Sequence, residues 1–298
     1  MENRPSKRAR NLFFLSILGV VFLLCRRTIG LVVKLSLSDE RYSYIILIPI
    51  ISAGIIVWKR ETIFCNVRVC LGWGVPALLL GAVLYLFEGS GISVAVETFA
   101  IVLMLVGGFV LCFGTQCARE AMFPLLFLLL AIPVPASLLA EAVAGLQEGS
   151  AQTTAVLFHI LGVPVVRHGM RFSLPGVDIE VAEQCSGIRS SLSLFISGLV
   201  ASYLLLHAAG NRILFSLITI PVAIFKNGVR IVALSWLGVY VNQGFLHGRL
   251  HQYGGLPVSL LALGILGPVV LGLRRLEGHR QGHARTETPR AMEVSNLA

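Results

Sequence analysis

Apolar residues in this chain are gathered into long runs, and short polar or basic segments separate the runs. A helix that crosses a bilayer needs roughly 20 apolar residues, because each residue adds about 1.5 Å along the helix axis. The pattern therefore predicts an all-α polytopic membrane protein with about eight transmembrane helices. The predicted spans are residues 12–25, 44–58, 71–87, 92–113, 122–139, 188–206, 213–225 and 256–273.

The basic residues between these runs indicate how the chain is oriented. We expect an uncleaved first span with a cytoplasmic N-terminus, because Arg26 and Arg27 follow the first run directly and no small-residue cleavage site is present. These two arginines either snorkel toward the lipid headgroups or face inward toward an anionic lipid or substrate. Threading the chain from this start places the basic residues of the short loops on the cytoplasmic side: Lys59, Arg60, Arg68, Arg119, Arg212, Arg274 and Arg275.

Two segments on the opposite side, residues 140–184 and 226–255, are too long to be simple turns. Within the first, residues 141–161 have apolar positions at helical spacing, which is typical of a helix that lies on the membrane surface. Residues 165–181 hold a Pro-Gly turn between short alternating stretches and predict a β-hairpin. We expect these segments to form a small extracytoplasmic cap.

The composition excludes an ordinary soluble enzyme. Of the 298 residues, 56% are hydrophobic and 13% are charged, and the mean hydropathy is +0.83, whereas soluble domains have about 25% charged residues. The formal net charge of +9 comes from basic residues scattered over loops and tails, so it indicates orientation in the membrane and no nucleic-acid partner is expected. Residues 1–276 are predicted to form a single membrane domain, and residues 277–298 a disordered cytoplasmic tail.

Cys185 stands where the predicted hairpin meets the sixth span. A helix N-terminus favours a thiolate through the helix dipole and offers backbone donors to an oxyanion. A cysteine in a membrane helix is otherwise just a small apolar residue. Here Ser186, Gly187 and Arg189 follow it directly, and this polar setting favours a reactive thiol that these three residues support.

Two further candidates are predicted at the same outer side. Arg230 ends the seventh apolar run, with Asn227 three residues earlier on the same helix face; the alternative is an arginine that snorkels to the headgroups, like Lys226 beside it. His251, just before the last span, could carry a proton, and His247 could replace it. The two histidines could instead be exposed loop residues or bind a metal, but no HExxH motif or third ligand is nearby, so no metal is expected.

Cys185, Arg230 and His251 come from three separate segments, yet the predicted topology places all of them at one membrane face. A nucleophilic thiol, a cationic donor and a proton carrier are the groups that acyl transfer from a peptide requires. The sequence holds no GxSxG, Walker or Rossmann motif, so serine hydrolases and nucleotide-binding enzymes are excluded and no cofactor is expected.

At these residues the chain resembles the exosortase/archaeosortase family of multi-span membrane cysteine transpeptidases. The resemblance rests on the Cys-Ser-Gly-Ile block at Cys185, the Asn-x-x-Arg-Ile block at Asn227 and the His-x-x-x-Gly block at His251, in this order. It covers most of residues 40–275.

The resemblance implies that Cys185 is the nucleophile, that Arg230 stabilises the oxyanion or positions the thiolate, and that His251 is the third catalytic group. It also implies a bacterial inner-membrane enzyme with its active site outside. Its substrates would be exported proteins with a C-terminal sorting signal of the PEP-CTERM type, and exopolysaccharide machinery would be a further partner. The competing hypothesis is a transporter or assembly factor without enzymatic activity, in which arginines bind anionic lipid or exopolysaccharide.

Overall fold

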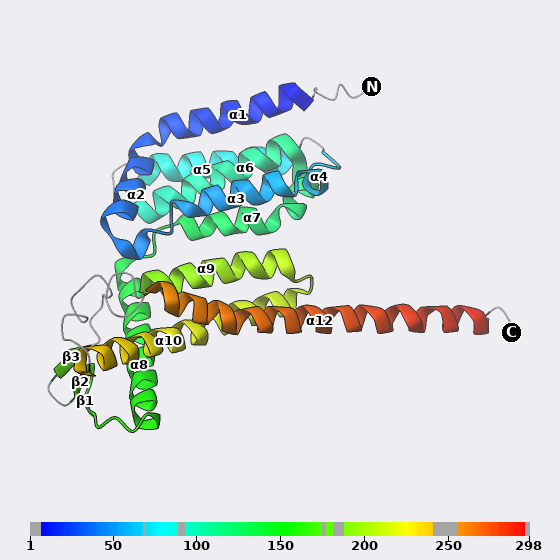
Figure 1. The fold of residues 1–298 in the computed structure, drawn as a ribbon. Helices are drawn as coiled ribbons and strands as arrows, with labels where there is room; N and C mark the ends of the chain where they lie inside the picture. The colour runs from blue at the N-terminus through cyan, green and yellow to red at the C-terminus, as the bar shows by residue number, and fades with distance from the viewer. Residues whose placement is uncertain are drawn as a thin grey trace, which may run out of the picture. The chain divides into compact units, whose positions relative to one another are not determined.

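The computed structural model describes residues 7–67, 70–88, 93–174, 177–180, 188–240 and 255–295. The chain divides into two compact units, residues 1–138 and 139–298, where the sequence predicted a single membrane domain. Each unit is built mainly of helices, and Figure 1 labels them along the chain. The two units are described in turn.

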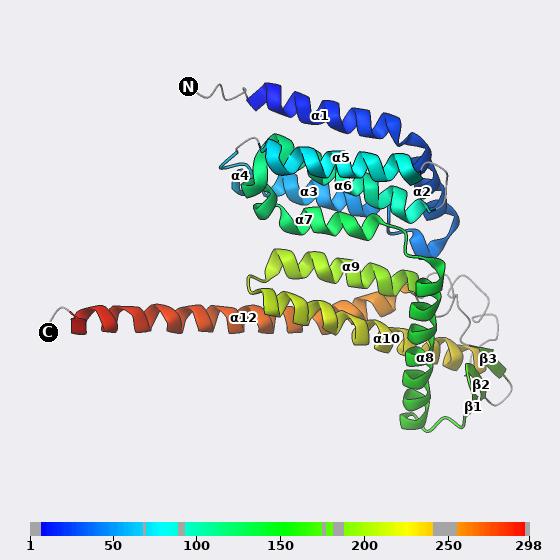
Figure 2. The same cartoon turned by 180° about the vertical axis from the view of Figure 1, so that it is seen from behind.

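The first unit consists of helices, most of which lie side by side in both ribbon views (Figures 1 and 2). Its core holds a cluster of aromatic rings, in which Phe113 contacts Phe14, Phe64 and Phe109 with ring centroids 4.8 to 5.1 Å apart. The helices are α1 (Lys7–Leu24), α2 (Arg26–Ser38), η1 (Glu40–Tyr42), α3 (Leu47–Trp58), α4 (Arg60–Ile63), α5 (Leu71–Glu88), α6 (Val94–Glu120), α7 (Met122–Phe127) and η2 (Leu128–Ala131).

Helices α5 and α6 approach each other closely because glycines line their contact. A Cβ atom added to Gly74 would lie 2.5 Å from the backbone of Leu111, and one added to Gly107 would lie 2.6 Å from the backbone of Leu78. Small residues let membrane helices come close enough for backbone and side-chain packing, since lipid offers no hydrophobic drive for helix association.

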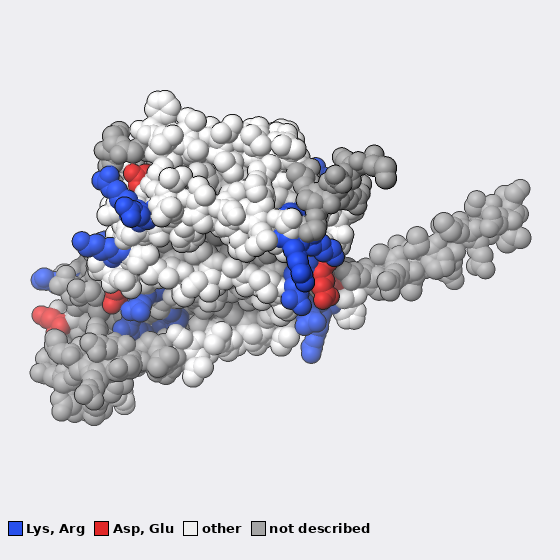
Figure 3. Space-filling view, turned by 90° about the horizontal axis from the view of Figure 1, so that it is seen from above, with Lys and Arg blue, Asp and Glu red and all other residues white. Residues whose placement is uncertain are grey.

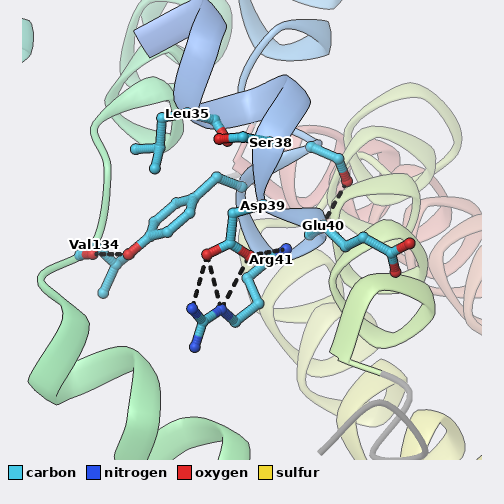
Figure 4. Close-up of polar contacts among 8 residues, drawn as sticks. Leu35, Ser38, Asp39, Glu40, Arg41 and Val134 are labelled. Atoms are coloured by element: carbon cyan, nitrogen blue, oxygen red, sulfur yellow. Dashed lines mark hydrogen bonds and ion pairs between the residues drawn. The ribbon is translucent and has the colours of Figure 1, made fainter. Parts of the chain in front are cut away.

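Polar contacts hold the connection between α2 and α3 (Figure 4). The Asp39 carboxylate accepts a hydrogen bond from the Arg41 backbone N–H at 2.9 Å and forms an ion pair with the Arg41 guanidinium at 2.8 Å. This guanidinium holds the pKa of Asp39 below its usual value. The Tyr42 hydroxyl donates to the carbonyl of Val134 at 2.8 Å, so the connection is tied to the segment that follows η2.

In the second unit, three long helices pack on one another and a fourth helix, α8, crosses them steeply (Figures 1 and 2). The apolar core is formed by buried residues of these three helices and of the connections beside them, including Leu206, Phe215, Ala262 and Leu266. The elements are α8 (Ala136–Ile160), β1 (Val166–His168), β2 (Arg171–Leu174), β3 (Val177–Glu180), α9 (Ile188–Leu205), α10 (Ala209–Tyr240) and α12 (Gly255–Ser295).

The helices confirm a polytopic membrane protein. Among the described residues, five helices are long and apolar enough to cross a membrane, and the number rises to seven if each of two bent pairs is one span. On the face drawn in Figure 3, uncharged side chains form a broad band, and the charged side chains gather at its ends. The fifth apolar run stops being helical at Ala131, ahead of Pro133 and Pro135, because prolines disfavour a continuing helix.

Three sequence predictions differ from the structure. The predicted hairpin is a three-stranded sheet in the order β1-β2-β3, because β2 pairs antiparallel with both β1 and β3. The seventh apolar run, predicted to end at Phe225, belongs to the longer helix α10. The tail predicted to be disordered from Glu277 is helical as far as Ser295. Its start is fixed because the Glu277 carboxylate accepts hydrogen bonds from the backbone N–H groups of His207 and Ala208, in the connection before α10, at 2.9 and 3.0 Å.

Candidate active site

The candidate site lies along the second half of α10. This helix has 32 residues and is therefore about 48 Å long, longer than the roughly 30 Å hydrocarbon core of a bilayer. Arg212 stands near its start. Lys226 and Arg230 lie about 21 and 27 Å further along the helix axis, a separation close to the roughly 30 Å thickness of the hydrocarbon core.

Helix α8 packs on α10 at this depth. The side chain of Asn227, which is 1% exposed, donates a hydrogen bond from Nδ2 to the Ser150 hydroxyl at 3.0 Å. One residue further, a Cβ atom added to Gly228 would lie 2.7 Å from Cγ2 of Thr153. Two contacts therefore fix α8 against this part of α10: the buried hydrogen bond between Asn227 and Ser150, and the close approach of Gly228 to Thr153.

The sheet covers the same part of α10 on another side. Phe172 of β2 is fully buried with Phe158 of α8, and both belong to one apolar cluster with Ile231 and Val232 of α10. An ion pair between Arg167 of β1 and Glu148 of α8, at 2.8 Å, ties the sheet to the crossing helix. Helix α8, the sheet and the second half of α10 are therefore one packed substructure.

Helices α9 and α10 run antiparallel, and two contacts fix their register. A Cβ atom added to Gly198 would collide with Cγ2 of Thr219, and the hydroxyls of Ser202 and Ser216 are 3.5 Å apart. Because positions rise on one helix as they fall on the other, the first turn of α9 lies at the level of residues 226–230 on α10. The structure thus brings the start of α9 to the level of Arg230.

The structure describes three of the predicted site residues. Arg230 is half-buried on α10, Asn227 is buried beside it, and Arg189 is exposed in the first turn of α9. The amide of Asn227 hydrogen-bonds to α8, a structural contact that the sequence did not predict. The other predicted residues lie outside the described residues: Cys185, Ser186, Gly187, His247 and His251.

Two other polar features lie in the first unit and not on α10. Arg26 and Arg27 are exposed at the 74° bend between α1 and α2, so they do not face the interior of the first unit. In the same unit, a buried carboxylate was not predicted. Glu97 accepts a hydrogen bond from Thr28 at 2.5 Å, and the Thr28 hydroxyl lies 3.1 Å from that of Tyr85. An acidic residue inside an apolar run was the signal that could have indicated it.

The long apolar helices define a multi-pass helical membrane protein, with a polar candidate site in the second half of α10. Over residues 36–267, the sequence matches the family described as transmembrane exosortase (Exosortase_EpsH). This match covers well over half of the chain, and the protein belongs to that family. Comparisons with curated proteins and with solved structures give no significant match.

Proposed function

We propose that this protein is a membrane-embedded cysteine transpeptidase or protease that cleaves exported proteins bearing a C-terminal sorting signal. The observation that carries the proposal is the register of α9 on α10. The first turn of α9, which begins three residues after Cys185, lies level with Arg230. A thiol before a helix N-terminus and a guanidinium at the same depth are the nucleophile and the oxyanion donor of one acyl-transfer site.

In the proposed reaction, the Cys185 thiolate attacks the carbonyl carbon of the scissile peptide bond. Arg230, together with backbone N–H groups at the start of α9, stabilises the negative oxygen of the tetrahedral intermediate. The C–N bond then breaks, and the leaving amine takes a proton from His251. Water or an acceptor amine attacks the resulting thioester, His251 takes a proton from that nucleophile, and Cys185 is released as the thiolate.

We infer eight crossings, with both termini in the cytoplasm of a bacterium and the site on the outer face of the inner membrane. The five long helices, the shorter apolar helix Leu71–Phe87 and the two bent pairs account for them, and in the second pair residues 122–139 make the crossing. The remainder of α8, from residue 140 onward, and the sheet then form the extracytoplasmic cap beside Arg230. Substrates of the PEP-CTERM type carry a hydrophobic span, which would place their sorting motif at this depth, and exopolysaccharide machinery remains the expected partner.

The test is processing of a co-expressed candidate substrate, measured as a mass shift on a gel. Cys185→Ala should abolish processing at unchanged membrane abundance, and Cys185→Ser should lose most of the activity because a hydroxyl is far less acidic than a thiol. The matched control replaces Cys65 and Cys70 by alanine and should retain substantial activity. Turnover of the substrate by the Cys185→Ala protein at the wild-type rate would reject the mechanism.

A further inference from the structure

Helix α2 leaves the end of α1 at a sharp bend. The pair is bent by 74°, and Cys25 lies at the junction (Figure 1). Helix α1 has 18 residues and is therefore about 27 Å long, close to the roughly 30 Å of a hydrocarbon core. Because α1 makes the first crossing in the proposed topology, α2 lies nearly in the plane of the membrane at its outer surface.

Two buried hydroxyl groups fix the rotation of α2 about its own axis. Thr28 donates a hydrogen bond to the Glu97 carboxylate of α6 at 2.5 Å, and Ser36 donates one to the carbonyl of Tyr42 at 2.9 Å. Both side chains therefore face the first unit. The positions on the opposite side of α2 face outward, away from the packed helices.

The outward side of α2 is divided into a basic strip and an apolar strip. Arg27 and Lys34 are exposed and share one strip, because they are seven residues, or about two helical turns, apart. Between them, a Cβ atom added to Gly30 would meet nothing within 4 Å, so the space between the two cations is open. Val33 and Leu37, which are 39% and 77% exposed, form the neighbouring apolar strip. This division is typical of a helix that lies in the headgroup region.

The charge of α2 is not balanced by acidic residues on the helix. It contains Arg26, Arg27 and Lys34 and neither Asp nor Glu. The next acidic residue along the chain, Asp39, forms its ion pair with Arg41. Basic residues are normally concentrated in the cytoplasmic loops, so three of them on an outer helix run against the orientation signal of the rest of the chain. Their position indicates an anionic partner at the outer surface.

We propose that α2 is an interfacial helix that binds anionic phospholipids. Arg27 and Lys34 bind the lipid phosphate groups through charge-assisted hydrogen bonds, and Val33 and Leu37 lie among the acyl chains. Lipid fits this surface better than an acidic peptide does, because the apolar strip beside the cations is itself exposed. The inference rests on the proposed eight-crossing topology and is independent of the proposed protease activity.

The experiment places a fluorescent reporter on the apolar strip. Leu37→Trp is introduced into the full-length protein after the native tryptophans, Trp58, Trp73 and Trp236, have been replaced by phenylalanine, and the protein is reconstituted into phosphatidylcholine vesicles. Quenching by brominated phosphatidylglycerol is compared with quenching by brominated phosphatidylcholine. Only a brominated chain that reaches the reporter quenches it, so free phosphate gives no signal. The anionic lipid should be preferred by about 5-fold for each of the two basic side chains.

Variants of the two cations test whether they cause the preference. Arg27→Gln combined with Lys34→Gln should remove it, whereas Arg27→Lys should keep it, because attraction to a headgroup depends on the positive charge. The matched control combines Lys7→Gln with Arg8→Gln, which removes the same charge at exposed positions at the start of α1. This control should leave the preference at the reporter unchanged.

Three results would overturn the inference. The two brominated lipids could quench the reporter equally, neither lipid could quench it, or the preference could persist when both Arg27 and Lys34 are replaced by glutamine. Because the readout is contact with lipid, each result is obtained whether or not the protein cleaves a substrate, and failure of the proposed function is recognised separately.

Discussion

At the scale of single residues, Arg230 is the position where charge and geometry can be separated. A donor to the oxyanion acts through the planar, forked guanidinium, whereas a headgroup anchor needs only a positive charge. Arg230 is half-buried on α10, next to the buried Asn227 and to the residues that pack on α8 and β2, and this position supports the first role.

We expect Arg230→Ala to slow substrate processing about 100- to 1000-fold, the usual effect of losing one oxyanion donor. Arg230→Lys keeps the charge and loses the fork, so its rate should lie well below wild type and above that of Arg230→Ala. The measurement is the processing rate at matched membrane levels. If Arg230→Lys works at the wild-type rate, Arg230 is an anchor, and the oxyanion role passes to Arg189 or the backbone at Cys185.

The sequence singles out Arg230 and Asn227 because polar residues inside an apolar run stand out without any structure. It cannot predict the partner of Asn227, since Ser150 is 77 positions away and meets it only because α8 crosses α10. The burial of Lys226 shows the same limit. A basic residue at the end of an apolar run is typical of an anchor, and its exposed fraction of 4% is seen only in the folded structure.

At the scale of elements, hydropathy locates the helices better than it locates their ends. The apolar run of α10 fades at Lys226, yet the helix continues to Tyr240 because Ile231 and Val232 pack against the sheet and α8. The third strand was missed because each strand has only three or four residues, too few for an alternating pattern to show how many strands the segment forms.

The glycine contact between α5 and α6 gives a prediction at this scale. In Gly74→Ala the new Cβ atom would lie 2.5 Å from the backbone of Leu111, which cannot yield without moving the helix. We expect the free energy of unfolding to fall by about 1 to 3 kcal/mol, as in other overpacked contacts. Thermal unfolding of the purified protein in detergent measures the change.

The matched control is Gly72→Ala, two residues earlier on the same helix, where an added Cβ atom meets nothing within 4 Å. It should leave stability unchanged or raise it by up to about 1 kcal/mol, because alanine favours helix more than glycine does. Equal destabilisation by both substitutions would contradict the close α5–α6 contact and point to a general effect on the helix.

At the scale of the whole molecule, alternating crossings decide whether the site residues meet at one face. The positive-inside pattern assigns the connection between α9 and α10, which contains His207, to the cytoplasm. In the proposed topology, α10 runs outward and brings Arg230, α8 and the sheet to the outer side. An error of one crossing anywhere before α9 would move the site to the cytoplasmic face.

Alkaline phosphatase fusions test this arrangement, because the enzyme is active only outside the cytoplasm. A fusion after Gly162, between α8 and β1, should be active. Fusions after His207 and after Ala298 should be inactive at comparable protein levels on an immunoblot, because α10 crosses the roughly 30 Å hydrocarbon core once and α12 returns across it. Activity after Ala298 would contradict eight crossings. Activity after His207 would mean that α10 crosses the membrane in the opposite direction. The second result would place Arg230 and the first turn of α9 in the cytoplasm, where no exported substrate could reach them.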